Sequence, residues 1–142
     1  MSFFKDSDDV YATLGKLFQT LADDPEHADL AARFRKANTV VQYAYTDPDA
    51  TVTVRLKEEG SGQIDFGETE MEPEVTMSMD ADTAHRFWLG QVNVTVALAR
   101  GQIKASGPVA KILKLVPLTK PVFPIYKAQL ERQGREDLLG VS

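Results

Sequence analysis

The sequence has 142 residues, a length typical of one domain with a substantial core. It contains no cysteine, which excludes disulfides, thiolate catalysis and cysteine-ligated zinc. Apolar residues make up 43% of the chain and charged residues 26%, as in ordinary globular proteins, and the net charge of −5 argues against a nucleic-acid partner.

The N-terminus has no cationic start followed by an apolar stretch, so no secretory signal is expected. The longest uncharged run, residues 87–99, has 13 residues, fewer than the ~20 needed to span a bilayer. We therefore expect a cytoplasmic protein in which residues 1–142 form a single domain.

Apolar side chains recur every three or four residues between positions 8 and 22, which predicts an amphipathic helix. Asp24 followed by Pro25 has the pattern of an N-cap and a first helical position, so a second, short helix is expected there. The buried faces of these helices are expected to carry Val10, Leu14, Leu17, Phe18, Leu21, Leu30, Ala31 and Phe34.

The middle of the chain changes its period. Residues 51–57 alternate strictly between apolar and polar side chains, which predicts a half-buried strand. A second strand is expected at 39–46, joined to the first by a turn at Asp47-Pro48-Asp49. After another turn at 60–62, strands are expected at 63–66 and 75–79. We expect a meander in which chain neighbours pair antiparallel.

The last third returns to helical signals. Asp80 predicts the N-cap of a helix that runs through Leu89 and stops at Gly90. A short strand at 102–106, a helix beginning at Pro108 and a terminal helix at 125–135 are expected next. Between them, residues 92–98 alternate as cleanly as a strand, and local propensity alone favours β structure there.

The charge is distributed unevenly. Residues 1–80 carry a net charge of −10, whereas residues 81–142 carry +5. Four lysines of the basic half stand among apolar residues, as on surfaces that meet anionic headgroups. The alternative is an ordinary amphipathic helix with a solvated lysine face. These four are Lys111, Lys114, Lys120 and Lys127.

Signals for catalysis are weak. His27 and His85 are isolated, and neither belongs to a metal-binding pattern. Asp80 and Asp82 could share a cation, but helix capping already accounts for Asp80. No Gly-x-Ser-x-Gly motif is present. We therefore expect no metal and no cofactor.

An enzyme acting on a hydrophobic substrate is one alternative. Tyr43, Tyr45 and Asp65 fall on expected strands, and a carboxyl group in an apolar pocket can transfer protons. The competing interpretation is that both tyrosines pack in the core while Asp65 faces water.

A cluster of methionine and aromatic residues points to apolar volume in the second half. Methionine adapts to irregular shapes, so the cluster suits either a ligand cavity or a plain core. Its members are Met71, Met77, Met79, Phe87, Trp88 and Leu89.

Residues 74–118 resemble the sterol carrier protein type 2 lipid-binding family. The likeness lies in the strand Val75–Asp80, the helix end Leu89-Gly90 with Gln91-Val92-Asn93, the segment Arg100–Lys104 and the apolar helix after Gly107. That helix carries Lys111, Leu113, Lys114 and Leu115, and the spacing from Gly90 to Gly101 to Gly107 needs no insertion.

The resemblance implies an α+β fold with a five-stranded, mostly antiparallel sheet covered by helices and an internal hydrophobic tunnel. It implies a short helix at Val92–Ala99 despite the alternation there. It also implies non-enzymatic binding, and transfer, of a fatty acid, acyl-CoA, sterol or phospholipid. An accessory protein that presents a lipophilic intermediate, such as a quinone precursor, to partner enzymes is a further alternative.

Pattern and resemblance together predict an apolar ligand site with a C-terminal lid at residues 117–130. Lys114, Lys120 or Lys127 is expected near an anionic headgroup, and transient contact with an anionic membrane is expected. The residues expected to line the site are Val75, Met77, Met79, Phe87, Trp88, Leu89, Val92, Val96, Ile103, Ile112, Leu113, Val116 and Phe123.

Overall fold

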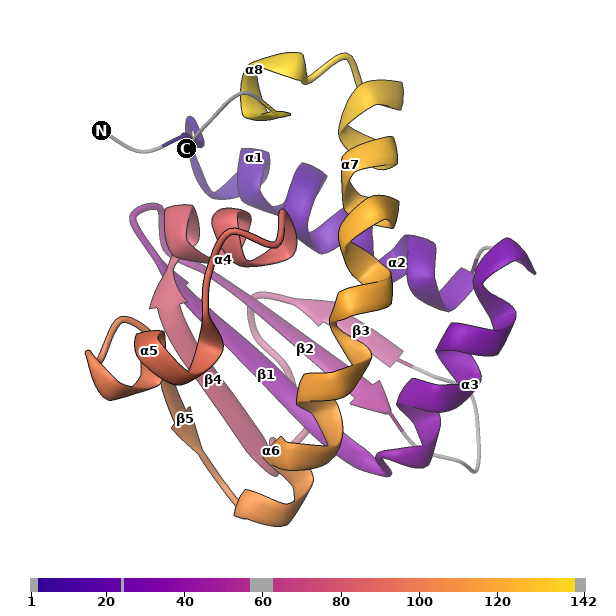
Figure 1. Cartoon of the computed structure of the whole chain (residues 1–142), viewed down its shortest axis with the longest axis vertical. Helices are drawn as coiled ribbons and strands as arrows, with labels where there is room; N and C mark the ends of the chain where they lie inside the picture. The colour runs from indigo at the N-terminus through magenta and orange to yellow at the C-terminus, as the bar shows by residue number, and fades with distance from the viewer. Residues whose placement is uncertain (1–2, 24, 57–62, 140–142) are drawn as a thin grey trace.

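The computed structural model describes residues 3–23, 25–56 and 63–139. In this part of the chain, helices cover one face of a five-stranded sheet with the order β3-β2-β1-β4-β5 (Figure 1). The strands are β1 (Thr39–Thr46), β2 (Ala50–Leu56), β3 (Gln63–Phe66), β4 (Val75–Asp80) and β5 (Lys104–Ser106). The α+β class predicted from the sequence is confirmed.

The sheet is mixed but mostly antiparallel. β1 pairs antiparallel with β2, β2 with β3, and β4 with β5, whereas β1 and β4 run parallel. The expectation that all chain neighbours pair antiparallel is therefore wrong for β4. Residues 67–74 carry the chain from β3 at one edge past β2 to the far side of β1, where the Glu74 amide donates to the Val40 carbonyl (2.8 Å). A parallel pair requires such a crossover, whereas a hairpin turn suffices for an antiparallel one.

The N-terminal region is helical, as the spacing of its apolar residues predicts. α1 (Ser7–Val10), a π-helical turn (Tyr11–Gly15) and α2 (Lys16–Asp23) follow one another without a break. The Asp6 side chain caps the start by accepting from the Asp9 amide. After a 3-10 turn at Pro25–His27, α3 occupies Ala28–Lys36. The N-cap expected at Asp24 lies outside the described residues, as does the turn at 60–62.

The helices of the second half begin with α4 (Ala81–Trp88), which Asp80 caps as expected by accepting from the Thr83 amide (2.6 Å). Then come α5 (Val94–Ala99), α6 (Val109–Leu115), 3-10 turns at Val116–Leu118 and Lys120–Val122, α7 (Phe123–Arg132) and α8 (Glu136–Leu139). Within the described ranges, no helix is both long and apolar enough to cross a bilayer.

Residues 94–99 form a helix, as the resemblance implied, and not the strand that the local alternation favours. α5 begins at Val94, two residues later than expected, and the Asn93 side chain caps it by accepting from the Val96 amide (3.2 Å). Ala97 is buried beneath it, with 1% of its surface exposed. Tertiary packing therefore outweighs the β-propensity of the valines.

A buried histidine on α4 contacts the last two described helices, α7 and α8. His85 on α4 lies 2.8 Å from both the Tyr126 hydroxyl and the Leu138 carbonyl. The carbonyl can only accept, so Nε2 carries the proton and Nδ1 accepts from Tyr126. Neutral His85 thus joins α4 to α7 and α8 with both ring nitrogens satisfied.

Candidate functional site

Two apolar cavities lie between the sheet and its helices. The α2–α3 cavity holds about 630 Å³ of empty space out to its open mouth, and the α5–α6 cavity about 510 Å³. The α2–α3 cavity is lined by Phe18, Leu21, Ala22, Ala31, Phe34, Arg35, Tyr43, Val54, Arg55, Gln63, Ile64 and Trp88. The α5–α6 cavity is lined by Tyr43, Met77, Met79, Phe87, Trp88, Val94, Ile103, Ile112, Leu115, Val116 and Thr119.

The floor of the α2–α3 cavity comes from the sheet and its roof from the helices. Val54 and Ile64 are cross-strand partners on β2 and β3. Phe18 on α2 stacks on Tyr43, with ring centroids 4.9 Å apart, and meets Trp88 edge to face at 5.9 Å. Interlocked rings of this kind hold their positions firmly, because each restricts the rotamers of the next.

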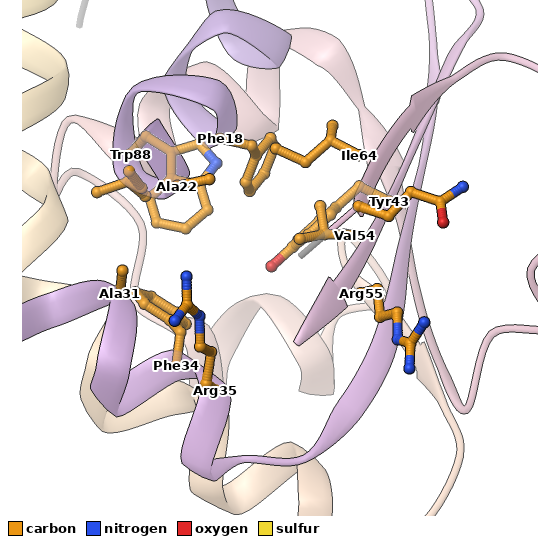
Figure 2. Close-up of a pocket in the computed structure, with 12 residues that line it drawn as sticks. Phe18, Ala22, Ala31, Phe34, Arg35, Tyr43, Val54, Arg55, Ile64 and Trp88 are labelled. Carbon is orange, nitrogen blue, oxygen red and sulfur yellow. The ribbon is translucent and has the colours of Figure 1, made fainter. Parts of the chain in front are cut away.

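The polar groups of this cavity are few. Figure 2 shows the Tyr43 hydroxyl and the Arg35 guanidinium pointing into the cavity from opposite sides, whereas the guanidinium of Arg55 points away. Burial raises the pKa of Tyr43, so its hydroxyl stays protonated and can donate or accept a hydrogen bond. Arg35 is thus the lining residue that brings a charge to the cavity.

The α5–α6 cavity is almost wholly apolar. β4 contributes Met77 and Met79, and the 3-10 turn after α6 contributes Val116. Thr119 adds a hydroxyl, which already donates to the Val116 carbonyl (2.8 Å). This wall can therefore exclude water around a hydrocarbon but offers little to fix its orientation.

The structure brings together seven of the thirteen residues expected to line the site. The α5–α6 cavity is lined by Met77, Met79, Phe87, Trp88, Ile103, Ile112 and Val116. The other six are absent from both linings. Val75 and Leu89 are buried in the core, Val92 and Phe123 are half-buried against it, and Val96 and Leu113 are exposed.

The sequence interpretation missed Tyr43, Val94, Leu115 and Thr119 in the α5–α6 cavity and all of the α2–α3 cavity except Trp88. The apolar faces of the first helices were recognised, and Phe18, Leu21, Ala31 and Phe34 belong to them. The same period predicts a packed core and a cavity wall, so the pattern alone could not separate the two.

The expected headgroup and lid residues lie elsewhere. Lys114, Lys120 and Lys127 are exposed, and none lines either cavity. Within the expected lid at 117–130, side chains of the 3-10 turn and α7 are fully buried parts of the core, namely Val122, Tyr126 and Leu130. Thr119 is the residue of this segment that reaches a cavity wall.

The residues of the alternative proton-transfer site are separated by the sheet. Tyr43 and Tyr45 stack on the helix-covered face, with centroids 6.2 Å apart, and burial raises the pKa of both. Asp65 follows Ile64, which faces the cavity, so its side chain points to the opposite face. There it accepts from the Thr69 hydroxyl (2.7 Å). The acid and the tyrosines therefore share no cavity.

No group of three or more metal-binding side chains is assembled among the residues that the structure describes. Asp80 is engaged in capping α4, and His85 is engaged on both ring nitrogens.

Comparison with protein families gives a match over residues 17–120 to the family described as the SCP-2 sterol transfer family. Comparison with curated proteins gives no match. The sheet and helices superpose on solved structures with low sequence identity, which shows a shared fold.

Three such structures are representative. The apo form of sterol carrier protein 2 from Yarrowia lipolytica is 18% identical, with a TM-score of 0.65 over 86% of this chain and 98% of that one. The sterol carrier protein domain 2 of Helicoverpa armigera is 19% identical, with a TM-score of 0.65 over 87% and 96%. A UbiJ-SCP2 ubiquinone synthesis protein is 17% identical, with a TM-score of 0.53 over 86% and 95%.

Proposed function

The chain belongs to the SCP-2 sterol transfer family, and from this premise we propose that it is a non-enzymatic carrier that holds a lipid-like ligand between its sheet and its helices. The observation that carries the proposal is the pair of adjoining apolar cavities, which share the side chains of Tyr43 and Trp88. Ligand sites are typically concave and apolar with few polar groups. We propose that a ligand long enough to occupy both cavities passes these two side chains, so that the cavities together serve as the tunnel that the resemblance implies.

The energetics suit a carrier. Burying ~15 methylene groups at ~0.8 kcal/mol each yields about 12 kcal/mol. Association and ordering cost roughly 4–15 kcal/mol, so the net affinity is moderate and the ligand can leave. A wall that contacts mainly methylenes also discriminates little between chains, which favours a broad class of fatty acids, acyl-CoAs, sterols or phospholipids.

We assign the polar end of the ligand to the α2–α3 cavity. Arg35 points into this cavity opposite the Tyr43 hydroxyl, and a guanidinium binds a carboxylate or phosphate through two parallel hydrogen bonds (Figure 2). The α5–α6 cavity, with its methionines, then receives the hydrocarbon end. Arg35 thereby takes the role first expected of Lys114, Lys120 or Lys127.

We further propose that the whole chain acts as one domain. The two ends of the described chain pack on one another, since the Gln129 side chain on α7 donates to the Thr13 carbonyl (2.9 Å). Ligand release therefore requires motion within one core rather than between two bodies.

A second candidate is an accessory protein that presents a lipophilic intermediate to partner enzymes. The resemblance in fold to a structure described as a ubiquinone synthesis protein favours this alternative. The two candidates share the cavities and differ in what happens next. Transfer between vesicles by the isolated protein supports the carrier, and co-purification with enzymes of quinone chemistry supports the accessory protein.

The carrier proposal is tested by titrating the protein with a fluorescent fatty acid. Trp88 is the single tryptophan and lines both cavities, so bound ligand should quench its emission saturably. Val94→Phe fills the α5–α6 cavity and should weaken binding, whereas Val96→Phe makes the same change on an exposed position of α5 and should not. Equal effects of both, or no saturable signal with any lipid class, would refute the proposal.

The assignment of Arg35 has its own matched control. Arg35→Gln should weaken binding of a fatty acid about tenfold, because a charge-assisted hydrogen bond is lost, and leave the fatty alcohol of the same length unaffected. Arg55→Gln changes the lining arginine that points away and should change neither. Mass spectrometry of lipids extracted from the purified protein identifies the ligand class directly.

A further inference from the structure

The second half of the chain contains a long stretch without acidic residues. No aspartate or glutamate occurs from residue 83 to residue 130, although the same stretch contains seven lysines and arginines. It includes α5, α6 and β5 and most of α4 and α7. A surface of this stretch attracts anions at close range, although the chain as a whole is acidic.

The same stretch also carries exposed apolar side chains. Leu113 on α6 is 63% exposed and Val96 on α5 is 42% exposed, and Leu98 and Val116 follow at 37% and 36%. The remaining large apolar residue that is exposed to this degree in the described ranges, Phe66, is stacked on Tyr11. Leu113 and Val116 are three residues apart, which places them side by side along the helical path.

The cations near these apolar residues differ in their surroundings within the part of the chain that the structure describes. Lys111 is engaged, since it donates to the Asn38 carbonyl (3.1 Å) and pairs with Glu74. Lys104 points to the far face of the sheet, because its neighbour Ala105 is the partner of Met77, which lines a cavity. Lys114 and Lys120 are exposed; Lys114 follows Leu113 directly in the sequence, and Lys120 comes four residues after Val116.

The exposed apolar residues lie on or beside the two helices that line the α5–α6 cavity. Val94 on α5 and Ile112 and Val116 near α6 line that cavity, so the two helices flank it (Figure 1). Val116 both lines the cavity and is 36% exposed, so it lies on the rim. The apolar wall inside is thus continuous with the apolar residues outside.

We propose that this α5–α6 surface docks on a bilayer that contains anionic lipids. Leu113 and Val116 enter the interface, Lys114 and Lys120 meet the headgroups, and the cavity mouth faces the hydrocarbon from which cargo is taken. The choice of a bilayer rests on the carrier function proposed above, while the charge and exposure of the surface stand on their own. Few cations and few apolar side chains give the weak, reversible contact that repeated loading requires.

The test is flotation with vesicles of phosphatidylcholine alone and of phosphatidylcholine mixed with phosphatidylglycerol. Wild-type protein should bind the anionic vesicles and lose binding at high salt. Lys114→Gln and Lys120→Gln should each weaken vesicle binding about fivefold, the effect of one cation at such a surface. Leu113→Ser should weaken it by about tenfold and should not disturb the fold, because the side chain is 63% exposed.

Lys104→Gln is the matched control, because it removes the same charge from the opposite face of the sheet, and vesicle binding should not change. Equal losses for Lys104→Gln and Lys114→Gln would show a nonspecific charge effect and overturn the proposal. So would failure of the wild-type protein to float with anionic vesicles, and capture of an acidic protein by this surface in the absence of vesicle binding would assign it to a protein partner instead.

The outcomes also distinguish this proposal from the carrier function. A protein that quenches Trp88 fluorescence with a fatty acid in solution but ignores vesicles keeps the carrier function and loses the docking surface. A protein that floats with anionic vesicles through Leu113 and Lys114 but shows no saturable ligand signal keeps the docking surface and loses the carrier function.

Discussion

Tyr43 on β1 and Trp88 on α4 line both cavities, so their side chains form the partition between the α2–α3 and α5–α6 cavities. The Phe18 ring packs on both of them, with its centroid 4.9 Å from that of Tyr43 and 5.9 Å from that of Trp88, and so holds the partition in place. The length of ligand that fits therefore depends on these rings, since a chain that occupies both cavities must pass them.

Tyr43→Ala should merge the cavities and shift the preference toward longer acyl chains. Removing a packed ring should also lower the free energy of unfolding by about 2–4 kcal/mol. Tyr43→Phe keeps the ring and removes the hydroxyl, so it should leave the chain-length preference as it is. Titration with a series of fatty acids of increasing length measures the effect, and an unchanged preference in Tyr43→Ala would mean that ligands occupy one cavity only.

Local sequence patterns predicted an element correctly where neighbouring residues alone decide its structure. The strands at 39–46 and 63–66 have the predicted bounds, and Asp80 caps its helix, because alternation and capping are decided by neighbouring residues. Pairing of β4 with β1 depends instead on the route of residues 67–74, which leaves no periodic signal. The short helix α8 was missed for a related reason, since its position depends on the contact of the Leu138 carbonyl with His85.

Because of His85, the folded protein should become less stable at mildly acidic pH. Burial lowers its pKa in the folded protein, and Arg86 and Arg135 lower it further, against opposing effects of the Leu138 carbonyl and Asp82. The unfolded chain, with a histidine pKa near ~6.5, then binds a proton at a pH where the folded protein does not. The free energy of unfolding should therefore fall as the pH drops below ~6.5, by at most ~1.4 kcal/mol per pH unit, until the folded pKa is reached.

Urea denaturation between pH 7 and pH 5 measures this dependence, as the range lies above the titration of ordinary carboxylates at about pH 4. His85→Asn should be less stable than the wild type at pH 7, because the hydrogen bonds to Tyr126 and Leu138 are disturbed. Its stability should also be nearly independent of pH over this range. A variant that keeps the wild-type slope would assign the effect to another group.

The ion pair between Asp9 and Arg135 joins the first helical region to the segment between α7 and α8, and we expect it to stabilise the folded protein. Arg135 donates to Asp9 (2.6 Å), and their side chains are 27% and 16% exposed. Burial raises the pKa of Asp9, but the hydrogen bonds from Arg135 and the Lys5 amide outweigh it, so the pKa lies below its ordinary value. Arg135→Gln should lower the free energy of unfolding by about 1–2 kcal/mol.

A double-mutant cycle with Asp9→Asn isolates the pair, and the two losses should be strongly non-additive. Arg135 also pairs with Asp137, whose side chain is 62% exposed. Asp137→Asn removes this second pair and should lower the free energy of unfolding by less than about 0.5 kcal/mol. Additive losses for Asp9 and Arg135 would contradict a direct contribution of this contact.

Gly107 lies between β5 and α6, at a position where we expect no side chain to fit. Its φ is +128°, and a Cβ there would lie 2.3 Å from the Glu74 carbonyl oxygen on the neighbouring chain segment. Since backbone cannot yield as a flexible side chain can, Gly107→Ala should force β5 and β4 apart and lower the free energy of unfolding by about 3 kcal/mol. Gly134→Ala is the control, because its φ of +69° carries the left-handed strain while no atom lies within 4 Å of the added Cβ. That variant should lose about 1 kcal/mol in urea denaturation, and equal losses at the two glycines would show that strain rather than contact with Glu74 sets the cost.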